Sequence, residues 1–181
     1  MMGNRGGALH NDQREIVRPF KSRRWITCLL EFKGRHRSVM SPGRYTELFF
    51  LDEAVAFAAG HRPCAECRRE RFNAFKNAWN PNGSISADEI DAELHRSRID
   101  KHGKKVTYDT SLNSLPNGCF VRINGSAYLV WDDALLLWRP EGYAERVLRG
   151  SGTVRVLTPR PIVERFRQGD EPEFHRSACV I

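Results

Sequence analysis

The sequence lacks the long apolar segments of membrane and secreted proteins. No apolar run in the 181 residues approaches the roughly 20 that a membrane-spanning helix needs. The N-terminal region also has no apolar core of a secretory signal peptide. These absences predict a cytoplasmic protein without a membrane partner. The first 15 residues are Gly-rich and polar, so we expect a loose arm there.

Several catalytic motifs are missing as well. The chain has no phosphate-binding glycine loop, no serine-nucleophile elbow and no His-Glu-x-x-His run. The sequence therefore identifies no catalytic residue. This favours a binding protein over an enzyme.

Cysteine is present in an odd number, which argues against a disulfide framework. The five cysteines are Cys28, Cys64, Cys67, Cys119 and Cys179. In a reducing compartment, a close Cys-x-x-Cys pair is more typical of a metal or redox site than of a structural bridge. Cys64 and Cys67 form such a pair.

Hydrophobic periodicity and turn residues predict an N-terminal lobe in which a β-hairpin precedes helices. Alternating apolar residues predict a strand at 24–32, with a return strand at 36–40. Helices are expected at 52–59, with Asp52 as N-cap and Gly60 after its end, and at 63–79. A third helix begins at Ser86, which forms a capping-box pattern with Glu89.

The rest of the chain predicts a small antiparallel β lobe with one helix. Asn124-Gly125 lies between two apolar segments and is a strong hairpin signal. The polar segment 97–117 is expected to connect lobes at 1–96 and 118–181, and the fold class is α+β. The expected C-terminal elements are strands at 119–123, 126–131, 134–138 and 154–157 and a helix at 159–168.

The segment from Phe49 to Arg69 contains a short helix, Gly60, Arg62-Pro63 and the Cys64/Cys67 pair, in that order. This pattern resembles the second half of the zinc-binding domain of the bacterial Ada DNA-repair protein. The chain also resembles small bacterial proteins that carry the same segment, which brings no known activity. In the Ada family the helix ends in Gly-aromatic-Arg-Pro-Cys-x-x-Cys, and His61 stands here at the aromatic position. The resemblance implies that the two cysteines are half of a four-ligand zinc site.

The first ligand pair of that family is absent, because segment 35–40 contains no cysteine. In Ada a cysteine of this pair accepts a methyl group from DNA, so methyl transfer is not expected in this chain. His36 is the best substitute ligand, followed by Cys28 and His61. Cys28 also lies on the apolar face of its strand, which is typical of a buried small side chain.

Three interpretations of the cysteine pair remain open. It could bind zinc with these further ligands. It could be a thiol redox or nucleophilic site, with Cys64 activated by a helix N-terminus and His61 close by. It could also be a scaffold that has lost its metal. The resemblance favours zinc.

The net charge of +7 is concentrated at the N-terminus, where residues 1–48 contain ten Lys and Arg against four Asp and Glu. Aromatic residues are interspersed, which suits phosphate contacts combined with base stacking. We therefore predict a nucleic-acid-associated protein, with DNA favoured over RNA and a role in DNA repair or processing. The alternative is a thiol-dependent or hydrolytic enzyme with a site between the lobes. The predicted contact residues are Arg18, Lys21, Arg23, Arg24, Arg35, Arg37 and Arg44, with Arg62 and Arg68 beside the cysteine pair.

Overall fold

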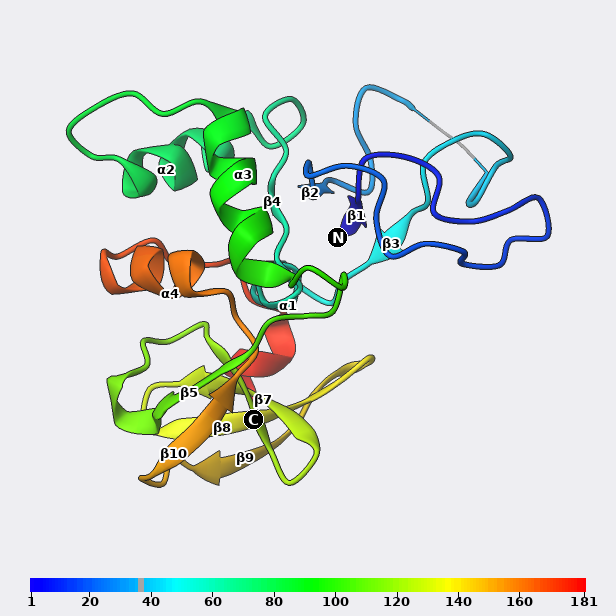
Figure 1. Cartoon of the computed structure of the whole chain (residues 1–181). Helices are drawn as coiled ribbons and strands as arrows, with labels where there is room; N and C mark the ends of the chain where they lie inside the picture. The colour runs from blue at the N-terminus through cyan, green and yellow to red at the C-terminus, as the bar shows by residue number, and fades with distance from the viewer. Residues whose placement is uncertain (36–37) are drawn as a thin grey trace.

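The structure is a computed structural model that describes residues 1–35 and 38–181. It has two sheets and four α-helices in its described part, which confirms the α+β class. Figure 1 shows the N-terminal sheet and the six-stranded C-terminal sheet in different parts of the molecule, with α1 (Glu53–Ala58) between them. None of the described helices combines the length and apolarity of a membrane span.

The N-terminal sheet has the order β3-β1-β2-β4. The expectation of a loose N-terminal arm was wrong, because β1 lies inside this sheet, antiparallel to β2 and β3. Gly3 permits this position, since a Cβ there would come within 2.5 Å of the Phe50 ring. The strands are β1 (Met2–Asn4), β2 (Ile26–Cys28), β3 (Leu48–Phe49) and β4 (Arg62–Pro63).

The predicted hairpin of strands 24–32 and 36–40 is not formed. The first strand is only the three residues of β2, and residues 38–40 are not a strand. Residues 36–37 lie outside the described part of the chain. Both edges of β2 are occupied, by β1 on one side and by the parallel strand β4 on the other, so a hairpin partner has no free edge.

The starts of two helices follow the local signals. Asp52 Oδ1 accepts the backbone N–H of Val55 over 2.9 Å and begins α1, and Gly60 follows its end with φ +81°. The capping box of Ser86 and Glu89 begins α3 (Ala87–Arg98). The C-terminal helix is α4 (Arg160–Arg167).

The second helix begins later than predicted. It was expected from residue 63, but α2 spans Arg69–Trp79. The backbone of Arg62, Pro63 and Cys64 is used in pairing with β2, and a four-residue turn follows before the helix. The cysteine pair therefore precedes the helix and does not lie in its first turn.

The C-terminal sheet has the order β5-β10-β6-β7-β8-β9. The predicted hairpin joins β6 and β7, with Asn124 and Gly125 both at positive φ. The segment 97–117 is more than a connection, because it contains the end of α3 and the edge strand β5. The strands are β5 (Tyr108–Ser111), β6 (Phe120–Ile123), β7 (Ser126–Trp131), β8 (Ala134–Arg139), β9 (Gly142–Leu148) and β10 (Thr153–Val156).

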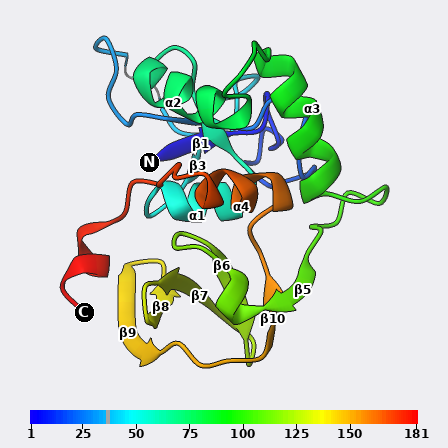
Figure 2. The ribbon, with the colours of Figure 1, turned by 90° about the vertical axis from the view of Figure 1, so that its left-hand side faces the viewer.

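In both Figure 1 and Figure 2, the four helices lie on the side of the C-terminal sheet that faces the N-terminal sheet. Figure 2 shows α1 and α4 above the C-terminal sheet, with α2 and α3 farther from it. One core cluster joins Phe57, Phe75 and Ile90 to Val121 and Ile162. The hydrophobic core is therefore continuous across the two predicted lobes, and the lobe boundaries themselves remain a prediction.

Candidate metal centre

Strand pairing brings Cys28 beside the Cys-x-x-Cys pair. In the parallel register of β2 and β4, Thr27 lies opposite Pro63, so the next residues are Cys28 and Cys64. The backbone N–H of Cys64 donates to the Thr27 carbonyl oxygen over 2.9 Å and extends this pairing. The turn that follows β4 then returns Cys67 to the same point.

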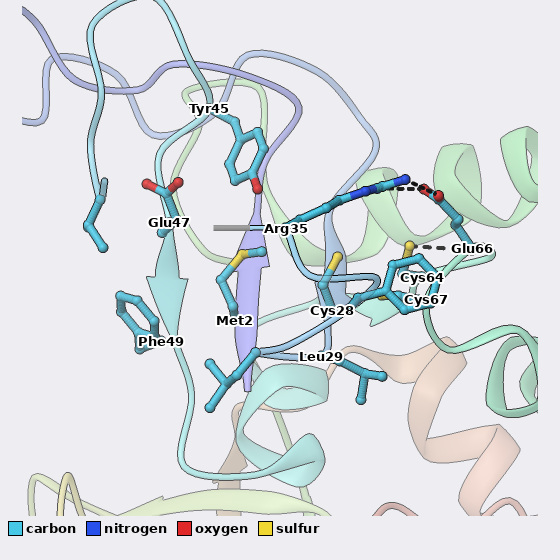
Figure 3. Close-up of a pocket in the computed structure, with 13 residues that line it drawn as sticks. Met2, Cys28, Leu29, Arg35, Tyr45, Glu47, Phe49, Cys64, Glu66 and Cys67 are labelled. Atoms are coloured by element: carbon cyan, nitrogen blue, oxygen red, sulfur yellow. Dashed lines mark hydrogen bonds and ion pairs between the residues drawn. The ribbon is translucent and has the colours of Figure 1, made fainter. Parts of the chain in front are cut away.

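The three sulfur atoms lie within 4.8 Å of one another. Thiolates bound to a tetrahedral zinc ion at about 2.3 Å lie roughly 3.8 Å apart, so shifts of about an ångström would complete the geometry. Figure 3 shows the three side chains converging from β2 and from the turn that precedes α2. The donor set fits zinc, because soft thiolates are preferred zinc ligands.

The cluster favours one thiolate at Cys64. The pKa of Cys64 falls to about 5, because its sulfur accepts a hydrogen bond from the Cys28 thiol and others from backbone N–H groups. One of these is the N–H of Glu66, 3.4 Å from the sulfur. The pKa of Cys28 is raised mainly by the same contact, and that of Cys67 by burial. The contacts among the three sulfurs therefore favour ionisation of Cys64 over that of Cys28 and Cys67.

The cysteines face a cavity of about 270 Å³. Tyr45, Glu47 and Phe49 line the side opposite Cys28 (Figure 3). Arg35 forms an exposed ion pair with Glu66, 2.7 Å between nitrogen and oxygen, at the cavity edge. The sequence assigned no role at this site to Glu47, Phe49 or Glu66, although Glu66 lies inside the Cys-x-x-Cys motif. The cavity leaves room for a fourth ligand.

The other proposed ligands differ in their placement. Cys28 belongs to the cluster, although its apolar strand pattern was more typical of a core residue. His61 does not join it, because its ring is fully buried between Trp25 and Phe50, with ring centroids 5.3 and 4.7 Å away. His36 lies outside the described residues. Among the described residues, no His, Asp or Glu joins the three cysteines in a metal-binding group.

Two of the predicted nucleic-acid contacts are buried. Arg62 is 4% exposed and forms a two-pronged ion pair with Asp91, at 2.7 and 2.9 Å. Arg68 is 5% exposed and donates to Glu53, a fully buried carboxylate, over 2.7 Å. Both guanidinium groups neutralise buried carboxylates, so neither is available to a phosphate at the surface.

The remaining predicted contacts are on the surface wherever the structure describes them. Arg24 pairs with Asp88, and both side chains are more than half exposed. Arg37 lies outside the described residues. The other exposed residues of the set are Arg18, Lys21, Arg23, Arg35 and Arg44.

Three comparisons with known proteins found no match to this chain. No protein-family model, curated protein or solved structure matches the chain. The Ada resemblance of residues 49–70 therefore remains a prediction from the sequence.

Proposed function

We propose that this chain is a zinc-binding, nucleic-acid-associated protein. The convergence of Cys28, Cys64 and Cys67 from two distant segments is the observation that carries the proposal. A metal ion bound there would join β2 to the turn before α2 and so stabilise the N-terminal sheet. His36 is the first candidate for a fourth ligand from the chain.

The protonation pattern of the cluster supports zinc binding coupled to proton release. Only Cys64 has a lowered pKa, so Cys28 and Cys67 would lose protons when the metal binds. Metal affinity should therefore fall as the pH is lowered. Because the ligands come together only in the folded chain, the binding energy would also stabilise the fold.

A surface groove beside the centre supports the nucleic-acid part of the proposal. This groove has a volume of about 620 Å³ and contains the side chains of Arg24, Arg44 and Tyr45. Gly43 also lines it and has open space on its Cβ side, whereas Ser22 and Lys21 cover Gly6 and Gly7. Two guanidinium groups and a phenol ring suit phosphate contacts and base stacking. Tyr45 also lines the cysteine cavity, so the two sites are adjacent.

Metal analysis tests the first half of the proposal. Mass spectrometry of the purified protein should find one zinc per chain, and a chelator should remove it and lower the melting temperature. A protein that contains no metal, takes up none from added zinc and melts alike with and without chelator would refute zinc binding.

Salt-dependent binding tests the second half. Affinity for mixed-sequence duplex and single-stranded DNA should fall steeply as salt rises, because bound cations release counterions from phosphates. RNA of the same length should bind less tightly. Binding that is absent at low salt, or indifferent to salt, would remove the nucleic-acid assignment and leave zinc binding untouched.

A second candidate function is a thiol-dependent enzyme. The lowered pKa of Cys64, beside an open cavity, favours it. It requires that Cys64→Ser abolish a reaction while the melting temperature stays unchanged. The zinc proposal requires the melting temperature to fall.

A further inference from the structure

A second cavity, of about 300 Å³, lies away from the cysteines, and three elements of the fold meet at it. Val55 and Ala58 of α1 contribute one side, and the segment after α3 contributes Lys105. Phe120 and Trp138 of the C-terminal sheet contribute another. Figure 2 shows α1 directly above this sheet. Most of the wall is therefore apolar and aromatic.

Three cations line this cavity: Arg5, Arg98 and Lys105. The guanidinium carbons of Arg5 and Arg98 lie 3.9 and 4.0 Å from the centroid of the Trp25 ring. Their hydrogen bonds go mainly to backbone carbonyl oxygens: Arg98 donates to Gly60 and Arg23, Arg5 to Pro19, and Lys105 to Ala58. These bonds satisfy donors without cancelling charge.

Within the described residues, none of the three cations forms an ion pair with a carboxylate. Burial lowers the pKa of Arg5 to about 10, of Arg98 to about 9 and of Lys105 to about 8. The carboxylate of Asp91 opposes this shift at Arg98, and repulsion by Arg5 adds to it at Arg98 and Lys105. Positive charge that no direct ion pair neutralises is costly in a partly dry cavity, and an anion would relieve that cost.

Hydrogen-bond donors without partners near the cavity also favour an anionic ligand. The indole Nε1 of Trp138 and the Nε atoms of Arg5 and Arg98 are buried and lack a hydrogen-bond partner among the described residues. Arg98 as a whole is only 1% exposed. Buried donors of this kind normally have partners, so these three atoms add to the unrelieved polar cost of the cavity wall.

We infer that this cavity binds a small organic phosphate whose other end is aromatic or apolar. The phosphate would lie near Arg5, Arg98 and Lys105, because three cations match a doubly charged group better than a single carboxylate. The ring would pack among Val55, Phe120 and Trp138. This site is separate from the cysteine cluster and does not depend on zinc or nucleic acid.

Calorimetric titration with phenyl phosphate at neutral pH and low salt tests this assignment. One phenyl phosphate should bind per chain, and inorganic phosphate and benzyl alcohol should each bind at least about tenfold more weakly, since each supplies half of the contacts. Benzoate with an affinity equal to that of phenyl phosphate would overturn the phosphate assignment. Inorganic phosphate with that affinity would overturn the aromatic part, and no binding of phenyl phosphate at millimolar concentration would overturn the whole.

Substitutions locate the site. Lys105→Gln retains a donor for the Ala58 carbonyl but loses the charge, and should weaken phenyl phosphate binding about tenfold. Lys104→Gln is the matched control, because Lys104 is exposed like Lys105 but does not line the cavity, and it should bind like the parent. If Lys105→Gln does not fold, Arg5→Gln replaces it with the same expectation. Equal affinity in the folded charge variant and the control would refute the site.

Discussion

The backbone N–H of Cys64 donates to the carbonyl oxygen of Thr27 over 2.9 Å, and this bond aligns two segments that lie 37 positions apart in the chain. It continues the parallel pairing of β2 with β4 by one residue. Cys28, the neighbour of Thr27, is thereby placed beside Cys64. The third sulfur of the candidate metal centre thus comes from strand pairing and not from a sequence motif.

Cys28→Ser should impair metal binding if this placement matters. The hydroxyl is a much poorer zinc ligand than a thiolate. We expect at least about 2 kcal/mol less stability in zinc-loaded protein, or roughly 4–8 °C in melting temperature. Cys179→Ser is the matched control, because Cys179 is exposed and outside the cluster. Equal zinc content and equal melting in the two variants would exclude Cys28 as a ligand.

Asp91→Ala should destabilise the fold whether or not metal is bound. It leaves the buried Arg62 guanidinium without its carboxylate, and such losses cost about 3–5 kcal/mol. Asp88→Ala, which removes the partner of the exposed Arg24, should cost much less. Urea unfolding of both variants measures the difference. Similar midpoints would contradict a structural role for the Arg62–Asp91 pair.

His61→Phe should change how stability depends on pH. Burial, reinforced by the positive charges of Arg5 and Arg98, holds the pKa of His61 well below its usual 6.5. Below about pH 6.5, the His61 imidazole is therefore protonated in the unfolded chain but stays neutral in the folded chain. The contribution of His61 is complete above about pH 6.5 and is lost as the pH falls, with a slope approaching about 1.4 kcal/mol per pH unit.

Urea unfolding between pH 5 and 8 tests that sign. Below about pH 6.5, the free energy of unfolding of the parent should fall more steeply with pH than that of His61→Phe. Near pH 8 the two free energies should differ by a constant amount that no longer depends on pH. Other titrating groups are shared by the two proteins and cancel in the comparison. Parallel curves over the whole range would show that His61 accepts its proton in the folded state as easily as in the unfolded state.

Arg44→Gln should weaken DNA binding without affecting the fold. Arg44 is exposed and lines the groove beside Tyr45, so its loss should reduce the slope of log affinity against log salt by about one. Arg139→Gln is the control, because Arg139 is an exposed residue at the end of β8 in the C-terminal sheet. If Arg139→Gln reduced the slope as much as Arg44→Gln, the groove would not be the binding surface.

Local signals in the sequence predicted the starts of α1 and α3 and the tight hairpin. Asp52 caps α1, Ser86 and Glu89 form the capping box of α3, and Asn124-Gly125 makes the turn between β6 and β7. Each signal acts over two to four residues, so its effect can be predicted without knowledge of the rest of the fold.

Local signals did not predict the features that depend on long-range pairing. The short strand Met2–Asn4 has little intrinsic strand propensity, and only the edges of β2 and β3 make it part of a sheet. Arg62 and Arg68 lie in a basic stretch that was expected to be exposed. Both are buried instead, because they form ion pairs with Asp91 and Glu53. Their partners lie 29 and 15 residues away, beyond the reach of any local pattern.

The sequence by itself determined the α+β class, the helix caps and the presence of a Cys-x-x-Cys pair, because these depend on neighbouring residues and on side-chain chemistry. Only the tertiary structure decided that Cys28 completes a three-sulfur cluster and that Arg5, Arg98 and Lys105 share a cavity without carboxylates. Both groupings depend on which distant strands and helices pack together. Such packing is set by the burial of the whole chain and not by any one segment.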